Sequence, residues 1–502
     1  MEILLFLSSG LFLGWSLGAN DAANVFGTAV GTRMIRFRTA AIVCSVFIVL
    51  GATISGAGAA HTLGRLGAVN SLAGSFTVAL SAALTTFWMT RLKIPVSTSQ
   101  AIVGAIIGWN IYSSSVTDTA SLTKIMLTWV ACPLISALVA VGLFVVVRKA
   151  ISYFRPHLLE LDAGTRLGLL VVGAFGSYSL GANNIANVMG VFLPDNPFSD
   201  ISVLGLFNLT GTQQLFALGA VAIGVGVFTY SERVMRTVGS GLANISPVPA
   251  LVIVLAQSIT LFLFASEGLE HLLASNGLPT FPLVPVSSSQ AVIGAILGLS
   301  LFKGAGIRYN VLGGISLGWV ATPIAAGILA FFLLFFVDNV FDQQVSRQVQ
   351  YRIDEVVCEE LLRTGVQDEG LNGFMNRTVT NALTLKRDLQ ESTELNDEQI
   401  TKILDLAQLG NWKIDPAVIA ADIDKHWLTQ GQLKALRSIS GRQFDHVWQL
   451  NKALADASPE WRVKPAATVN KIFNKDLKKK QDYLDRLFKV DPASPESVGP
   501  VF

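Results

Sequence analysis

The segment Gly18-Ala19-Asn20-Asp21-Ala22-Ala23-Asn24-Val25-Phe26-Gly27 lies inside an apolar run that reaches back to Ile3. A carboxylate at the depth of a bilayer costs roughly 2.5 to 3.5 kcal/mol on insertion scales, which makes Asp21 a functional candidate. The other acidic residues of the apolar part of the chain fall in predicted loops or at segment ends. The flanking glycines weaken a helix, so backbone carbonyls could be freed to line a cavity. The alternative is that Asn20 and Asn24 only hold helices together.

The composition predicts a membrane protein with a soluble appendage. Hydrophobic residues make up 51% of the 502 residues and charged residues 14%, and the mean hydropathy is positive. Water-soluble folds do not combine these values. Charged residues are sparse up to Asp338 and dense from Phe341 onward, which places a domain boundary near Val340. We therefore expect an all-α polytopic membrane protein that ends in an α-helical soluble domain.

Three short motifs recur in the same order in the two halves of the apolar region. The first signature, at residues 18–25, returns at residues 181–188 as Gly-Ala-Asn-Asn-Ile-Ala-Asn-Val. Pro-Val-Ser-Thr-Ser-Gln-Ala at residues 95–101 returns at 285–291 as Pro-Val-Ser-Ser-Ser-Gln-Ala. Trp-Val-Ala-Cys-Pro at residues 129–133 returns at 319–323 as Trp-Val-Ala-Thr-Pro. Three matches in one order indicate an internal repeat.

The apolar segments fall into two sets of five. An odd number of crossings per repeat turns the second repeat upside down in the bilayer, which is the inverted-repeat plan of transporters with broken or re-entrant helices. We expect the first repeat in residues 1–150, the second in 151–340, the soluble helical domain in 341–490 and a flexible tail in 491–502. The expected spans are residues 3–31, 39–60, 71–90, 95–113, 125–147, 167–192, 212–230, 247–266, 285–302 and 310–337.

Basic residues in the loops predict how the chain is oriented in the membrane. Most of them fall in alternate loops, and the positive-inside rule places those loops in the cytoplasm. The loops at residues 61–70, 114–124, 193–211 and 267–284 then lie outside. With ten crossings the C-terminal domain also lies outside the cytoplasmic membrane, and one miscounted span would reverse this prediction.

The two hydroxyl triplets predict an anion site. Each follows a proline and opens a helix, where free N–H groups and partial positive charge attract anions. Two such helix ends facing each other would bind an anion without a buried basic residue. The alternative is that the hydroxyls are simple N-caps, and for the glycines behind them, Gly104, Gly108, Gly294 and Gly298, we expect close packing. The candidate anion ligands are Ser97, Thr98, Ser99, Gln100, Ser287, Ser288, Ser289, Gln290, Asn20 and Asn183.

Together, the doubled signature and the doubled triplet resemble those of the inorganic phosphate transporter (PiT) family of cation-coupled permeases, over about residues 3–337. The resemblance implies that these motifs form the phosphate and cation sites between the repeats. Some relatives carry sulfate, so a sulfate or related oxyanion permease stays an alternative. The residues that the resemblance assigns to the cation are Asp21, Asn24, Asn184 and Asn187.

Two positions depart from the family pattern. The second signature usually has an acidic residue where this chain has Asn184, which bears on the number or identity of coupling ions. Many members have His at the positions of Gln100 and Gln290, which bears on substrate preference.

A co-transported cation would balance the charge of the anion. Two helix N-termini contribute about 1 to 2 kcal/mol each, whereas desolvating a doubly charged oxyanion costs far more. Oxygen ligands suit sodium, and a proton on Asp21 is the alternative. We expect phosphate import by cation symport, without a cofactor, a nucleic-acid partner or enzymatic activity. A homodimer, a channel and a non-transporting anion receptor stay open.

In the C-terminal domain, helical spacing of apolar residues predicts a bundle. The expected helices cover residues 343–363, 398–408, 432–455 and 467–489. Asn396 followed by Gln399 predicts a capping box at the start of the second of these helices.

Overall fold

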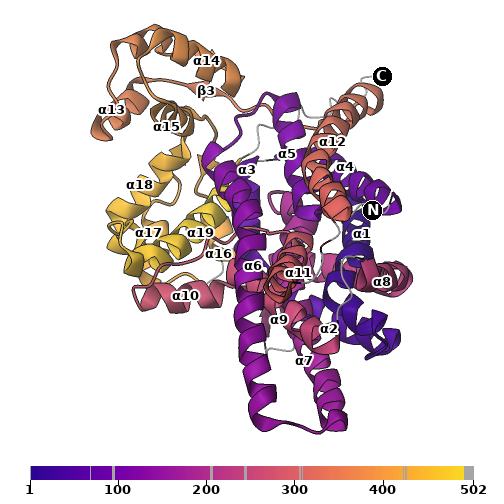
Figure 1. The fold of residues 1–502 in the computed structure, drawn as a ribbon. Helices are drawn as coiled ribbons and strands as arrows, with labels where there is room; N and C mark the ends of the chain where they lie inside the picture. The colour runs from indigo at the N-terminus through magenta and orange to yellow at the C-terminus, as the bar shows by residue number, and fades with distance from the viewer. Residues whose placement is uncertain are drawn as a thin grey trace. The chain divides into compact units, whose positions relative to one another are not determined.

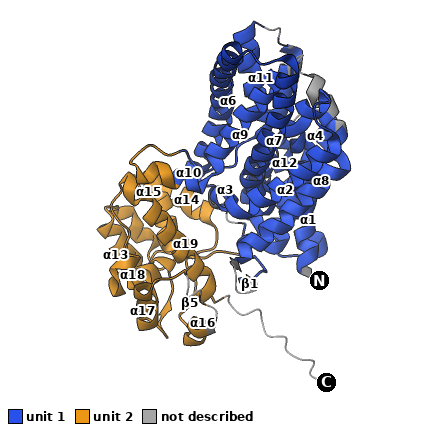
Figure 2. Cartoon of the chain, turned by 90° about the horizontal axis from the view of Figure 1, so that it is seen from below, with its two compact units in different colours: residues 1–113, 117–270, 281–347 blue, residues 114–116, 271–280, 348–502 orange. Residues whose placement is uncertain are grey.

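The protein is described by a computed structural model that covers residues 2–67, 69–92, 96–203, 207–241, 246–304, 307, 309–421, 423 and 427–490. The chain divides into two compact units (Figure 2). Unit 1 comprises residues 1–113, 117–270 and 281–347, and unit 2 comprises residues 114–116, 271–280 and 348–502. Pro95 and the predicted tail at residues 491–502 lie outside the described residues. The expected division between repeats at residue 150 stays a prediction.

Unit 1 is a bundle of long apolar helices (Figure 1). Each expected span corresponds to one main helix, although the span 39–60 also covers the start of the short helix α3, and the short helix α10 lies outside the expected spans. Within the described residues, seven helices are long and apolar enough to cross a membrane. A 3-10 turn and an antiparallel hairpin join α7 to α8: η1 Gly190–Phe192, β1 Ile201–Val203 and β2 Phe207–Leu209. The helices are α1 Glu2–Gly31, α2 Phe37–Ser55, α3 Ala57–Leu66, α4 Leu72–Arg91, α5 Thr98–Ser113, α6 Thr119–Phe154, α7 Leu158–Met189, α8 Gly211–Gly241, α9 Pro247–Ala265, α10 Glu267–Ser275, α11 Ser288–Lys303 and α12 Tyr309–Phe341.

Helix packing in unit 1 follows the repeat. The most extensive contacts join α1 to α8 and α2 to α7, which are the same pair once the two halves are exchanged. In this exchange α1, α2, α4, α5 and α6 of the first half correspond to α7, α8, α9, α11 and α12 of the second. The contact of α5 with α12 therefore corresponds to that of α11 with α6, and the contact of α1 with α4 corresponds to that of α7 with α9. The two halves therefore use the same helix pairs. The inverted orientation of the second half stays a prediction.

The first glycine of each signature allows a close approach of two helix backbones. A Cβ at Gly18 would lie 1.9 Å from the carbonyl oxygen of Ile223 on α8. A Cβ at Gly181 would lie 2.2 Å from the carbonyl oxygen of Ile48 on α2. Because any side chain would clash there, each signature needs glycine at its first position.

The glycines behind the hydroxyl triplets are close-packing positions, which confirms that expectation. A Cβ at Gly104 on α5 would lie 2.0 Å from the carbonyl oxygen of Pro323, inside α12. A Cβ at Gly294 on α11 would lie 2.2 Å from the carbonyl oxygen of Pro133, inside α6. The third doubled motif therefore supplies the surface on which the triplet helices pack.

The signature helices themselves are unbroken. α1 and α7 continue through both signatures, so Gly18 and Gly27 do not free backbone carbonyls as expected. The close contact of Gly18 with α8 is made by a helical glycine, and this packing outweighs its low helix propensity. The interruptions lie elsewhere: at Gly56 between α2 and α3, at Ser266 between α9 and α10, and in the non-helical residues 278–287 before α11.

Unit 2 is mainly helical and contains two small antiparallel ladders. β3 Tyr351–Arg352 pairs with β4 Thr378–Val379, and β5 Trp412–Lys413 pairs with β6 Gln443–Phe444. Two apolar clusters form its core, one around Leu389 and Ile400 and one around Trp461 and Leu484. The helices are α13 Glu355–Arg363, α14 Ala382–Ser392, α15 Asp397–Ala407, α16 Pro416–Ala421, α17 Gln430–Ser438, α18 Val447–Ala457 and α19 Lys471–Phe488, with 3-10 turns η2 Glu369–Phe374, η3 Pro459–Trp461 and η4 Thr468–Asn470.

The predicted helices of unit 2 are correct in part. The capping box of Asn396 and Gln399 is confirmed. The helix expected at residues 343–363 is wrong in its first half, because residues 343–354 are not helical, β3 lies within them, and α13 begins only after its cap Asp354. The helix expected at residues 432–455 is divided, because Gly441 has a positive φ and β6 follows it.

Candidate functional site

Both signatures and both hydroxyl triplets are buried inside unit 1. Of the predicted ligands, Asn20 is half-buried and all the others are buried. Asn183 and Asn187 are 0% exposed and Asp21 is 2% exposed. Buried polar groups need hydrogen-bond partners, so the contacts among these side chains define what the site can bind.

The first signature binds the second triplet. The Ser288 hydroxyl donates to Asp21 Oδ2 at 2.9 Å, and Asn20 Nδ2 donates to Asp21 Oδ1 at 2.9 Å. Asn24 Nδ2 donates to Ser288 Oγ at 3.2 Å and to Ser289 Oγ at 3.4 Å. α1 and the start of α11 are therefore joined by a continuous hydrogen-bonded chain that ends on the carboxylate.

The second signature binds the first triplet in a related way. Asn187 Nδ2 donates to Ser99 Oγ at 2.8 Å, which is the counterpart of the bond from Asn24 to Ser289. It also donates to Asn184 Oδ1 at 3.0 Å. Each signature thus contacts the triplet of the other half, so the site is shared between the two halves.

A backbone contact fixes the orientation of the second signature's amides. Val286 N–H donates to Asn183 Oδ1 at 3.0 Å, and Asn183 Nδ2 donates to the Val286 carbonyl oxygen at 2.7 Å. Asn183 Nδ2 also donates to Asn184 Oδ1 at 3.3 Å. Since backbone atoms have defined donor and acceptor roles, this chain fixes Asn184 with its oxygen occupied and its Nδ2 turned away from Asn183.

The two triplets also bind each other's leading segment. Ser99 Oγ donates to the Val286 carbonyl oxygen at 3.2 Å, and Ser289 Oγ donates to the Val96 carbonyl oxygen at 3.0 Å. These reciprocal bonds hold the starts of α5 and α11 next to each other. The expected meeting of two helix N-termini is present in the structure.

The first hydroxyl of each triplet is an N-cap. Ser97 Oγ accepts from Gln100 N–H at 3.3 Å, and Ser287 Oγ accepts from Gln290 N–H at 3.2 Å. The simpler interpretation therefore applies to Ser97 and Ser287.

Several buried polar atoms of the site have no hydrogen-bond partner among the described residues. Two are donors or donor-capable, Asn184 Nδ2 and Thr98 Oγ1. Three are acceptors, Asn187 Oδ1, Gln100 Oε1 and Gln290 Oε1. Buried polar atoms without a partner are rare in native proteins, and a bound ligand or ion is one explanation of them. The site therefore offers both donors for an anion and oxygen atoms for a cation.

The two halves differ in the contact between the fourth residue of the signature and the middle residue of the triplet. Asp21 accepts from Ser288, whereas their counterparts Asn184 and Thr98 each leave a buried atom unpartnered. The first half therefore presents a carboxylate already held by a hydroxyl, and the second presents a free amide N–H and a free hydroxyl.

Some groups of the site were missed by the sequence analysis. Both backbone atoms of Val286 bind Asn183, and the Cys132 Sγ contacts the Ser287 carbonyl oxygen at 3.8 Å. Backbone groups leave no trace in residue type, so no pattern could have identified Val286. Cys132 lies in the third doubled motif, whose recurrence was the available signal.

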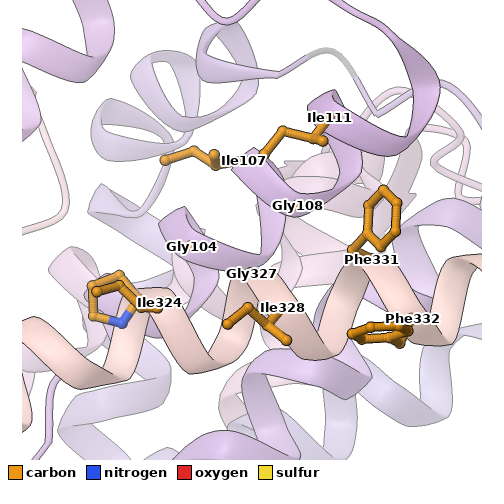
Figure 3. Close-up of a pocket in the computed structure, with 10 residues that line it drawn as sticks. Gly104, Ile107, Gly108, Ile111, Ile324, Gly327, Ile328, Phe331 and Phe332 are labelled. Carbon is orange, nitrogen blue, oxygen red and sulfur yellow. The ribbon is translucent and has the colours of Figure 1, made fainter.

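Two further features bear on what unit 1 can bind. Across the described part of the chain, no three His, Cys, Asp or Glu side chains lie together, so a cation here would be held mainly by neutral oxygens around one carboxylate. An apolar groove of about 480 Å³ lies between α5 and α12, where Gly104 and Gly108 face Gly327 (Figure 3). Its lining is hydrocarbon, and Phe331 and Phe332 lie along its α12 side, so it does not match a polar anion.

The sequence and the fold are similar to those of known proteins. The model of the phosphate transporter family matches residues 17–160, 160–270 and 273–441. A protein from Methanocaldococcus jannaschii, named as a candidate phosphate permease, is 29% identical over 335 residues, covering 66% of this chain and 97% of that protein. One with the same description from Haemophilus influenzae is 24% identical, covering 66% and 96%. A solved structure titled as the sodium-dependent phosphate transporter has a TM-score of 0.53 and 20% identity, covering 67% and 100%.

Proposed function

This chain belongs to the phosphate transporter family, and we propose that it imports phosphate together with sodium by alternating access. Transport, not catalysis, is the activity of this family, and the chain is a multi-pass membrane protein. The observation that carries the proposal is the reciprocal hydrogen bonding between each signature and the triplet of the other half. A site made jointly by two halves changes shape when one half moves against the other, as alternating access requires.

The donor groups support phosphate as the anion. Thr98 Oγ1 and Asn184 Nδ2 are buried and unpartnered, and the first turns of α5 and α11 add backbone N–H groups. A helix N-terminus favours an anion without burying a basic side chain. The orientation of Asn184 supports a role in anion binding rather than the cation role expected from its sequence position.

The single buried carboxylate supports a cation as co-substrate. Asp21 is held by the neutral donors Asn20 and Ser288, and among the described residues no basic side chain forms an ion pair with it. We place the cation at Asp21, with amide oxygens of Asn24 and Asn187 as further ligands. The charge of the cation offsets the cost of desolvating the anion. Moving an anion into a cell with a negative interior costs about 2.3 kcal/mol per charge per 100 mV, and the inward cation gradient supplies the free energy to overcome this cost. The fold likeness to a sodium-dependent phosphate transporter supports sodium over a proton.

Unit 2 supports an extracytoplasmic location for the C-terminal domain. It includes residues 114–116 and 271–280, which come from two loops predicted to lie outside. Val116 packs against the apolar cluster that contains Ile353, and Thr280 is hydrogen-bonded to Lys471. A domain that incorporates two such loops lies on the same side of the membrane as they do.

The proposal is tested with purified protein in liposomes. Radiolabelled phosphate and sulfate uptake are measured with sodium and proton gradients imposed separately. We expect phosphate to accumulate above its external concentration when sodium is high outside. Accumulation driven by a proton gradient alone would assign the coupling to protons. Equilibration without accumulation would indicate a channel, and binding without uptake a receptor.

A further inference from the structure

Gln100 and Gln290 occupy the same position in the two halves, directly after the hydroxyl triplets. They are 2% and 3% exposed. Their backbone N–H groups bind the capping serines, whereas each side-chain Oε1 is buried without a partner in the described structure. Two buried acceptors thus lie in the first turns of α5 and α11, whose starts are held together and to which the proposed function assigns the anion.

A buried acceptor beside an anion site has a specific chemical consequence. Oxygen atoms of a fully deprotonated anion cannot donate, so they leave the acceptor unpaired and repel its lone pairs. Phosphate at neutral pH keeps at least one P–O–H group, whereas sulfate keeps no proton. A site with only donors would bind both anions, and a site with acceptors favours the anion that carries a hydroxyl. Asp21 does not replace the glutamines in this role, because the proposed function assigns its carboxylate to the cation.

We propose that Gln100 and Gln290 accept the P–O–H proton of hydrogen phosphate and thereby select phosphate over sulfate. This inference rests on the proposed function, since it names the form of the anion that the same site carries. The two glutamines read the hydroxyl, while Thr98 and Asn184 donate to the unprotonated oxygens. The competing assignment is that the same Oε1 atoms bind the coupling sodium.

The test uses anions that differ in one group. Uptake of radiolabelled phosphate into liposomes is measured at fixed sodium with arsenate, sulfate or monofluorophosphate as competitor. Arsenate keeps a hydroxyl, and monofluorophosphate has fluorine where hydrogen phosphate has its hydroxyl. We expect arsenate to compete, and the other two to be weaker by about tenfold or more, since a site that binds a substrate hydroxyl rejects analogues without it. Monofluorophosphate that competes as well as arsenate would overturn the inference.

Two substitutions locate the effect. Gln100→Met and Gln290→Met keep the side-chain length and remove the acceptor. We expect at least one of them to narrow the preference for arsenate over monofluorophosphate by about tenfold, the cost scale of one unpaired buried group, with an unchanged sodium titration. A shifted sodium titration with an unchanged anion preference would assign the glutamines to the cation and refute the proposal.

The control is Gln432→Met, the same substitution at a buried, hydrogen-bonded glutamine of α17 in unit 2, outside both motifs. Its anion preference should equal that of the unmodified protein. If both test variants fail to fold, the competitor series on the unmodified protein still decides the inference. Absence of any phosphate uptake by the unmodified protein would contradict the proposed function itself and is thus a distinct outcome.

Discussion

Asp21 and Ser288 are separated by 267 residues, and the Ser288 hydroxyl donates to the Asp21 carboxylate at 2.9 Å. The acidic group of the first half is therefore held by the triplet of the second half. Ser288 also accepts from Asn24, so the carboxylate, the hydroxyl and the amide form one chain. A cation that binds Asp21 would act directly on the helix end that faces the anion, which is a short physical route for coupling.

Replacing this carboxylate tests that route. Asp21→Asn keeps the size of the side chain and one oxygen acceptor for Ser288, so expression and folding should be retained. Concentrative phosphate uptake under a sodium gradient should fall by at least tenfold, because the cation loses its one charged ligand. Uptake close to that of the unmodified protein would exclude Asp21 as the coupling residue.

The sequence was sufficient to find the helices and the motifs of the site. The spans followed from long apolar runs, and the shared site followed from motifs that recur in the same order. It could not reveal the orientation of the Asn184 amide, because that depends on a chain of bonds that starts at the Val286 backbone. The sequence also led us to predict freed backbone carbonyls at Gly18. That prediction is wrong, because the tight packing of Gly18 on α8 keeps helix α1 intact.

The glycine of the first signature provides a stability test. In Gly18→Ala the new Cβ would lie 1.9 Å from the Ile223 carbonyl oxygen, so α1 and α8 must separate. Overpacking of this kind typically costs about 1 to 3 kcal/mol, and we expect a lower melting temperature and reduced uptake. The control is Gly142→Ala in α6, where a Cβ meets nothing within 4 Å. Equal melting temperatures for the two variants would contradict the close contact.

The location of the C-terminal domain is testable by chemical labelling in intact cells. Ser392→Cys puts a thiol at an exposed position of α14, and Ser152→Cys puts one at an exposed position of α6 beside predicted cytoplasmic basic residues. Both are made with Cys358 replaced by Ser, since the other two cysteines are buried. An impermeant maleimide should label the first variant in intact cells and the second only after lysis. The reverse pattern would overturn the predicted orientation, and protection of both thiols until lysis would overturn the count of ten crossings.

Unit 2 contains a carboxyl group that makes its stability depend on pH. Burial raises the pKa of Asp485 above its ordinary value of 3.8, although the Trp412 indole N–H donates to it. A group whose pKa is higher in the folded than in the unfolded protein stabilises the fold fully at a pH below its unfolded pKa. This stabilisation is lost as the pH rises through the pKa of the folded protein. Asp485→Asn cannot ionise, so it should unfold at a higher temperature than the unmodified protein at pH 7, and the difference should shrink toward pH 4. Thermal unfolding of the whole chain in detergent, followed by tryptophan emission, measures this. A constant difference across that range would show that ionisation of Asp485 is not the cause.

The last prediction concerns the positions at which the two halves differ. Asn184 and Thr98 are the counterparts of Asp21 and Ser288, and each leaves a buried atom without a partner. Asn184→Asp supplies a carboxylate that can accept from the Thr98 hydroxyl, which would reproduce the arrangement of the first half. The added charge should strengthen cation binding, so we expect a lower sodium concentration for half-maximal uptake or a steeper Hill slope. Loss of the Nδ2 donor should at the same time raise the phosphate concentration for half-maximal uptake.

A second substitution, Thr98→Val in the Asn184→Asp protein, removes the hydroxyl that would hold the new carboxylate and should reverse part of the gain in sodium affinity. Sodium titrations that superimpose for the unmodified protein and Asn184→Asp would show that position 184 takes no part in coupling.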